Sequence, residues 1–123
     1  MTKRILVIED TEDNRQIVGD LLSSAGYELI EAVDGLEGVA TAEREQPDLI
    51  LMDIQLPGID GYEATRRIRA IPALAKVPII AVTSYALSGD EAKTREAGCD
   101  GYVAKPFSPR QLLAKIREFL PAE

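Results

Sequence analysis

What this sequence lacks excludes several kinds of protein. It contains no histidine, so neither a Cys–His nor a Ser–His catalytic pair can form. Cys99 is the single cysteine, which excludes an internal disulfide, and we favour a small, partly buried apolar side chain over a redox or nucleophilic role. No apolar run approaches the length of a membrane span, and the N-terminus has no signal-peptide apolar region. We therefore expect a cytoplasmic protein with no membrane partner.

Basic residues are also in short supply. The chain has 14 Lys and Arg against 21 Asp and Glu, a net charge of −7. Because the phosphate backbone of a nucleic acid attracts clustered cations, this balance argues against direct nucleic-acid binding. Hydrophobic residues make up 46% of the 123 positions, enough to bury a core. We expect one compact domain over residues 1–123.

Short apolar runs alternate with segments of helical spacing. The runs at 5–8, 49–52 and 79–82 are continuously apolar, which is typical of strands buried on both faces of a parallel sheet. Weaker strand runs lie at 28–30 and 101–104. Helices are predicted around 17–25, 36–45, 62–70, 89–97 and 109–120, and the mostly polar 89–97 segment should be the most exposed.

Two helices carry end signals. Gly26 is well placed to end the first, whose apolar positions share one stripe: Ile17, Val18, Leu21, Leu22 and Ala25. The last helix begins with an N-cap at Ser108, a proline at its first position and Gln111 closing a capping box. Its apolar stripe is Leu112, Leu113, Ile116, Phe119 and Leu120. The β-α order repeats five times, which predicts an α/β fold: a (βα)5 three-layer sandwich with helices on both faces of a parallel sheet.

Polar residues follow the predicted strands where ligands gather on open parallel sheets, at the carboxyl ends. The first strand ends in Glu9-Asp10, the third in Asp53, the fourth in Thr83-Ser84, and the fifth runs into Lys105-Pro106. Three acids, a hydroxyl and an ammonium thus converge on one edge of the sheet.

This set of side chains favours phosphoryl chemistry with a metal ion. Carboxylates that lie close together repel one another, and their full ionisation requires a cation between them. Mg²⁺ suits such a site because it prefers oxygen ligands, keeps waters and accepts phosphate oxygens. A phosphoryl group on Asp53 would supply one such oxygen, and Thr83, backbone N–H groups and Lys105 could bind the others.

Each position also has a simpler interpretation. Taken singly, Asp10 is more often a helix N-cap, Thr83 an ordinary strand residue and Lys105 a surface charge. The pair Glu9-Asp10 is commonly a solvated loop edge. Asp53 is harder to explain in this way, because four apolar residues lead directly into it and an unpaired carboxylate there is costly.

Four segments together resemble the receiver domain of bacterial two-component response regulators, over the whole chain. They are Ile5-Leu6-Val7-Ile8-Glu9-Asp10, Leu49-Ile50-Leu51-Met52-Asp53-Ile54-Gln55-Leu56-Pro57-Gly58, Ile80-Ala81-Val82-Thr83-Ser84 and Gly98-Cys99-Asp100-Gly101-Tyr102-Val103-Ala104-Lys105-Pro106-Phe107. Within the family the chain is most similar to DivK-type regulators and hybrid-kinase receivers. The resemblance implies a flavodoxin-like sheet of strand order 2-1-3-4-5.

The resemblance also implies roles for the residues at matching positions. Asp53 matches the phospho-acceptor; Glu9, Asp10 and the Gln55 backbone carbonyl match the Mg²⁺ site, with Mn²⁺ as a substitute ion. Thr83 matches the switch hydroxyl and Lys105 the lysine that binds the phosphoryl group. Tyr102 matches the aromatic switch residue, whose simpler interpretation is a half-buried strand aromatic. Gln55, Ser84 and Tyr85 correspond to flanking positions, of which Gln55 and Tyr85 tune phosphoryl lifetime, and the bond before Pro106 is cis in the family.

A receiver of this kind implies protein partners. They are a histidine kinase or histidine phosphotransferase as phosphodonor, and an unknown protein that reads the face formed by residues 88–118, with the chain a monomer or a dimer formed on phosphorylation. One departure from many receivers is Glu9 in place of Asp. We expect no enzyme activity beyond self-phosphorylation and slow loss of the chain's own phosphoryl group.

Three alternative functions fit the residues less well. A haloacid-dehalogenase-type phosphatase needs a second acid two residues after the nucleophile, where this chain has Gln55, and it needs a longer chain. A degenerate receiver that binds partners without phosphorylation usually lacks one of the five site residues, and this chain has them all. A nucleotide-binding module needs a glycine-rich loop after Ile8, where Glu9 and Asp10 stand instead.

Overall fold

The computed structural model describes residues 2–83 and 90–120. Its sheet has five strands, all parallel, in the order β2-β1-β3-β4-β5. The strands are β1 (Arg4–Ile8), β2 (Glu28–Ala32), β3 (Leu49–Asp53), β4 (Ile79–Thr83) and β5 (Gly101–Ala104). The predicted sheet and its strand order are confirmed.

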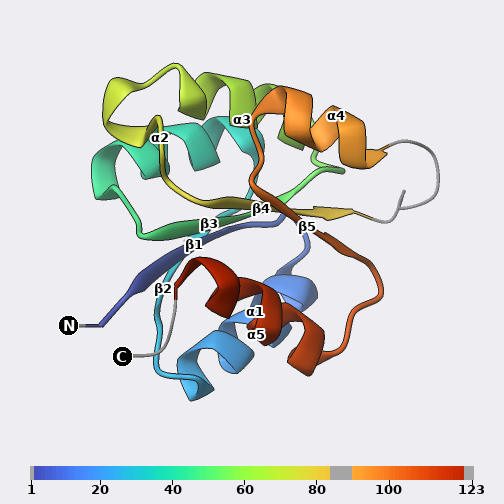
Figure 1. Ribbon diagram of the computed structural model, residues 1–123. Helices are drawn as coiled ribbons and strands as arrows, with labels where there is room; N and C mark the ends of the chain where they lie inside the picture. Colours follow the sequence, from blue (N-terminus) through green and yellow to red (C-terminus); the bar gives the residue numbers. More distant parts are fainter. Residues whose placement is uncertain (1, 84–89, 121–123) are drawn as a thin grey trace.

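Helices cover both faces of the sheet (Figure 1). They are α1 (Glu12–Ser24), α2 (Gly35–Glu45), α3 (Gly61–Arg69), the short 3₁₀ helix η1 (Pro72–Leu74), α4 (Asp90–Ala97) and α5 (Pro109–Phe119). Helices α2, α3 and α4 lie on one face, and α1 and α5 lie on the other. This arrangement is the predicted three-layer sandwich.

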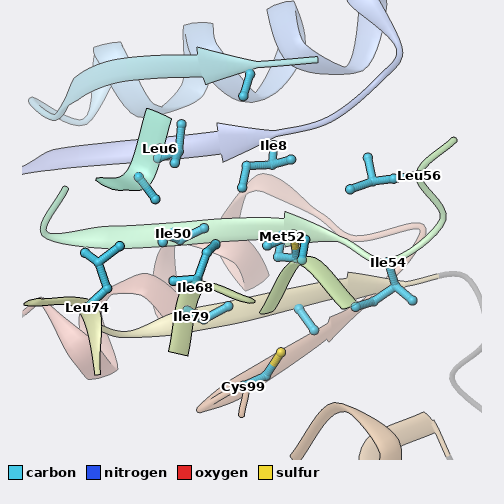
Figure 2. Packing of buried hydrophobic residues seen from close by; sticks show 14 residues of the cluster. Leu6, Ile8, Ile50, Met52, Ile54, Leu56, Ile68, Leu74, Ile79 and Cys99 are labelled. Carbon is cyan, nitrogen blue, oxygen red and sulfur yellow. The ribbon is translucent and has the colours of Figure 1, made fainter. Parts of the chain in front are cut away.

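Each face of the sheet has its own core because successive side chains of a strand point to opposite sides. On the face under α2 and α3, the strands contribute Leu6, Ile8, Ile50, Met52 and Ile79 to a cluster that includes Ile68 and Cys99 (Figure 2). On the opposite face, Ile5, Val7, Leu51 and Ile80 pack with Leu112 and Ile116 of α5. Strands buried on both faces explain why β1, β3 and β4 are continuously apolar in sequence.

The predicted C-terminus of α1 and the predicted N-terminus of α5 are confirmed. Gly26 follows the C-cap of α1 with φ of 94°, a left-handed conformation that glycine adopts without steric cost. At α5, the Ser108 side chain accepts from the Gln111 N–H, and the Gln111 side chain accepts from the Ser108 N–H. The capping box is therefore present, and it fixes where the chain leaves the loop after β5.

The apolar stripe of α1 differs from the prediction at one residue. Leu22 is buried, but Ile17 is 65% exposed. Ile17 belongs to the first half of α1, the half that follows the carboxyl end of β1. The predicted exposure of the 89–97 helix is seen in α4, where Thr94 and Ala97 are the buried residues within 91–97.

Within the described residues, no helix combines the length and apolarity required to cross a bilayer. The longest, α1, has 13 residues, against about 20 apolar residues for a span.

Candidate functional site

The acids predicted at the strand ends meet at the carboxyl edge of the sheet. Glu9 and Asp10 follow β1, and Asp53 is the last residue of β3, the strand beside it. One carboxylate oxygen from each of the three lies within 4.8 Å of the others. Glu9 and Asp53 are buried, while Asp10 is exposed. Asp10 does not cap α1, because the N-cap is Thr11.

Lys105 places a positive charge against this trio from the loop after β5. Its Nζ donates to Oδ2 of Asp53 at 3.2 Å and lies 3.5 Å from Oε1 of Glu9. The Lys105 side chain is 24% exposed, so water screens the two pairs only in part. The Lys105–Pro106 peptide bond is cis, as the family resemblance implied.

Local hydrogen bonds hold Glu9 in its position. Its Oε2 accepts from the Thr11 N–H at 3.1 Å, and its main-chain carbonyl accepts from Nη1 of Arg15 at 2.9 Å. Arg15 in turn lies 4.0 Å from a carboxylate oxygen of Glu31. Hydrogen bonds from the start of α1 therefore hold the Glu9 side chain close to the other two acids.

Gln55 connects two of the predicted site residues, a contact that the sequence did not reveal. Its N–H donates to Oδ1 of Asp53 at 3.0 Å, and its side-chain amide donates to Oγ1 of Thr83, also at 3.0 Å. Thr83 is fully buried at the end of β4. The acceptor candidate and the hydroxyl candidate are thus joined through a single residue between them.

Tyr102 lies on the same face of the sheet as Thr83. In the parallel pairing of β4 with β5, Thr83 is opposite Ala104 and Ala81 is opposite Tyr102. Paired residues and residues two apart share a face, so the Tyr102 and Thr83 side chains leave the sheet on the same side. Tyr102 is half-buried, and its phenolic oxygen has almost no exposed surface.

An apolar cavity of about 600 Å³ adjoins the acids on the side of α1 and α5. Glu9, Asp53 and Lys105 line its polar end, and its apolar walls are Val7, Val18, Leu51, Val82, Phe107 and Leu112. The exposed Ile17 also lines it, so the cavity reaches the surface there. We call it the α1–α5 groove. Sequence reasoning missed the groove, although an apolar residue in the second turn of a helix beside the site was a signal for it.

The donor set at this edge fits a small divalent cation. All three carboxylates offer oxygen, which is the ligand type that Mg²⁺ and Mn²⁺ prefer, and Asp10 remains open to water. The backbone carbonyl of Gln55 belongs to the loop that follows β3, two residues after Asp53. The predicted flanking residues Ser84 and Tyr85 lie outside the described residues.

Comparisons with known proteins agree with this fold. The family model described as the response regulator receiver domain matches residues 5–117. The polar-differentiation response regulator DivK of Brucella ovis is 42% identical over 120 residues, covering 98% of each chain.

Solved structures agree as well. The receiver domain of the sensor histidine kinase PA1611 from Pseudomonas aeruginosa, determined with a magnesium ion coordinated in its active site cleft, has a TM-score of 0.92 and 40% identity. That comparison covers 99% of this chain and all of the other. The chemotaxis protein CheY4 of Vibrio cholerae has a TM-score of 0.92 at 28% identity, covering 97% and 99% of the two chains.

These matches and the acid-lysine site define a class of signalling domain in which a parallel sheet presents its acids at one edge. The chain belongs to the response regulator receiver family of two-component signalling. Over nearly its whole length it is similar to DivK. Membership of the receiver family argues against a dehalogenase-type phosphatase and against a nucleotide-binding module.

Proposed function

We propose that this chain accepts a phosphoryl group on Asp53 and passes the signal to a protein partner by changing shape. The observation that carries the proposal is the arrangement around Asp53: its buried carboxylate has two further carboxylates within 4.8 Å and the Lys105 ammonium 3.2 Å from Oδ2. Such a set can bind a divalent cation on one side of the acceptor and a phosphoryl oxygen on the other.

Glu9, Asp10, Asp53 and the Gln55 carbonyl would hold Mg²⁺, or Mn²⁺ in its place. When bound, the ion neutralises charge on the transferring phosphoryl group. Asp53 provides the nucleophile: a carboxylate oxygen attacks phosphorus and forms an acyl phosphate. The bond from phosphorus to the donor breaks, and the donor's nitrogen or oxygen leaves with the electron pair. Lys105 binds an oxygen of the transferred group.

The phosphodonor we propose is a phosphohistidine on a histidine kinase or a histidine phosphotransferase. The α1–α5 groove supports this choice, because it brings an apolar wall and the exposed Ile17 to the edge of the Asp53 site. An apolar side chain of the donor protein that packs there would lose water-exposed surface while its phosphohistidine faces Asp53. Small acyl phosphates, which need no such contact, would serve as donors more slowly.

The proposed output is a change in the face formed by α4, β5 and α5. A new charge at Asp53 attracts the Thr83 hydroxyl, and Tyr102, which shares a sheet face with Thr83, then moves inward. The population of this face shifts, and a partner protein reads the shift. The chain would have no separate turnover substrate; its own slow hydrolysis of the acyl phosphate resets it.

Borohydride reduction tests the acceptor directly. Borohydride reduces an aspartyl phosphate to homoserine, so treatment of the phosphorylated chain should yield homoserine at position 53 in peptide mass spectra. Homoserine at another aspartate, or the corresponding reduced alcohol at a glutamate, with Asp53 unchanged, would overturn the assignment.

A further inference from the structure

Gln55 contacts both ends of the proposed switch. Its main-chain N–H donates to Oδ1 of Asp53, and its carboxamide nitrogen donates to Oγ1 of Thr83, each at 3.0 Å. The two contacted side chains start on opposite faces of the sheet. In the β3–β4 pairing, Asp53 is opposite Val82, so Thr83, one residue further on, points to the other side. Gln55 therefore spans the edge of the sheet between the acceptor and the hydroxyl.

Main-chain hydrogen bonds hold the backbone around Gln55, so the point from which its side chain starts is fixed. The Ile54 N–H donates to the carbonyl of Val82, and the Ile54 carbonyl accepts from the N–H groups of Leu56 and Gly61. The bond from Leu56 to Ile54 closes a three-residue turn with Gln55 at its centre. Loop movement therefore cannot relax the contact with Thr83 without breaking main-chain hydrogen bonds.

Burial strengthens the hydrogen bond from the Gln55 carboxamide to the Thr83 hydroxyl. Thr83 has no exposed surface, so water competes poorly for its hydroxyl. To donate to a phosphoryl group on Asp53, this hydroxyl must move from its face of the sheet toward the edge, which changes its present contact with the Gln55 carboxamide. The bond thus opposes the movement that the switch requires.

We propose that the Gln55 carboxamide is a latch that holds Thr83 in its resting position and sets how readily the chain switches. The inference rests on the proposed function and adds a positioning residue to it. In the phosphorylated chain, a new hydrogen bond from Thr83 to the phosphoryl group replaces the hydrogen bond from the Gln55 carboxamide. Only the difference in free energy between these two hydrogen bonds drives the switch.

The test removes the amide donor and observes Thr83 before any phosphoryl group is present. The probe is the ¹³C-labelled methyl group of Thr83 in NMR spectra of the whole chain with Mg²⁺, assigned with Thr83→Val. Spectra are recorded without donor and with saturating acetyl phosphate, and intact mass gives the phosphorylated fraction of each sample. Gln55→Met keeps the length of the side chain without a donor, and Gln55→Leu serves where methionine disturbs folding. Gln16→Met makes the same change at an exposed position on α1.

In unphosphorylated Gln55→Met, the Thr83 methyl resonance should move toward its position in the phosphorylated wild type. A neutral hydrogen bond of ordinary net strength corresponds to an equilibrium constant for switching about 2- to 10-fold larger. The Gln16→Met spectrum should match the wild type. Read from the Tyr102 ring resonances, Gln55→Met should have no further effect in a Thr83→Val background, because the bond has already lost its acceptor.

Two results would overturn the latch while leaving the proposed function standing. One is an unchanged Thr83 resonance in unphosphorylated Gln55→Met and Gln55→Leu chains that still gain a phosphoryl group, even if the phosphoryl lifetime changes. The other is a full Gln55→Met effect in the Thr83→Val background. A wild-type chain that gains no phosphoryl group would instead overturn the proposed function, and the latch with it.

Discussion

The ammonium of Lys105 lies 3.2 Å from Oδ2 of Asp53, although 52 positions of sequence separate the two residues. The contact joins the loop after β5 to the end of β3, across the intervening strand β4. It links the proposed acceptor to the segment that continues into α5, because Ser108 caps that helix only three residues beyond Lys105. A change of charge at Asp53 therefore acts directly on Lys105, in the loop that leads into α5.

Mg²⁺ should stabilise the chain through the acid trio. A ligand that binds only the folded state stabilises it by RT ln(1 + [L]/Kd), which is about 1.4 kcal/mol at a tenfold excess over Kd. For a chain of this size we expect the unfolding midpoint to rise by about 5 °C. Thermal unfolding with Mg²⁺ and with EDTA measures this shift.

The matched variants for that measurement are Asp10→Asn and Asp13→Asn. Both residues are exposed acids near the start of α1, but only Asp10 lies in the trio. Asp10→Asn should lose most of the Mg²⁺-dependent shift, and Asp13→Asn should keep it. Equal shifts in the two variants would place the ion elsewhere.

Ile17 should matter for transfer from a protein donor and not for transfer from a small one. Ile17→Ser removes an exposed apolar side chain that lines the α1–α5 groove. We expect the rate of transfer from a phosphorylated histidine phosphotransferase to fall about 10-fold, the effect of losing roughly 1.4 kcal/mol of apolar contact. Labelling by acetyl phosphate should stay at the wild-type rate.

Gln16→Ser is the control for Ile17→Ser, because Gln16 is the exposed preceding residue on α1 and does not line the groove. It should leave both rates unchanged. Ile17→Ser could instead slow labelling by acetyl phosphate as much as transfer from the protein donor. That result would show that Ile17 maintains the structure of the Asp53 site and does not bind the donor protein.

Arg69 is a structural clamp that sequence analysis did not identify. Its guanidinium donates to the carbonyls of Gly98 at 2.9 Å, Leu74 at 3.0 Å and Val77 at 2.7 Å, and to Oδ2 of Asp100 at 2.6 Å. The Arg69 side chain is only 17% exposed, and without it the three carbonyls would lose this donor. Since an ammonium cannot reproduce the planar set of donors, Arg69→Lys should lower the free energy of unfolding by about 2–3 kcal/mol.

Arg67→Lys on the same helix provides the comparison for Arg69→Lys. Arg67 is 46% exposed and pairs with Glu63, whose pKa is lowered by the hydrogen bonds from Arg67 and Arg66. This exposed pair contributes little, so we expect a loss much smaller than the loss in Arg69→Lys. Urea unfolding of the two variants measures both values, and a loss at Arg69 no larger than at Arg67 would contradict the clamp.

Cys99 should make stability fall at alkaline pH. Burial raises the pKa of its thiol above the ordinary value, against smaller opposing effects of the Thr65 hydroxyl and Arg69. The folded state therefore keeps its proton when the unfolded state has lost it. The stabilisation is complete below the unfolded pKa, near 9, and is lost as the pH rises from there toward the folded pKa.

Cys99→Ala removes this titration, so the variant should show a shallower loss of unfolding free energy between pH 8 and pH 10 than the wild type. The difference in slope should approach, and not exceed, about 1.4 kcal/mol per pH unit. Urea unfolding at a series of pH values gives the two slopes. Parallel slopes would show that Cys99 titrates alike in both states.

The sequence predicted the parts of the structure that depend on local pattern. The apolar runs that become β1, β3 and β4 are buried on both faces, and this requirement is visible in the residues themselves. The acids and Lys105 could be assigned to one edge because parallel strands present their carboxyl ends together. The helix ends at Gly26 and Ser108 followed from local capping chemistry.

What escaped prediction depends on distances between side chains that share no pattern. Nothing at position 55 indicates that its amide contacts Thr83, 28 residues away. Arg69 looks like the other arginines of α3 until the carbonyls of Leu74 and Val77 are placed around it. Ile17 belongs to the apolar stripe of α1 and is nevertheless exposed, because periodicity shows which face of a helix is apolar but not which of its residues are covered.

The most direct test of the account is the intact mass of the chain after incubation with acetyl phosphate and Mg²⁺, beside Asp53→Asn and an EDTA control. The wild type should gain one phosphoryl group, and neither Asp53→Asn nor the wild type in EDTA should gain any. A wild-type chain that gains nothing, from acetyl phosphate or from a phosphorylated histidine phosphotransferase, would contradict this prediction, and so would an equal gain by Asp53→Asn.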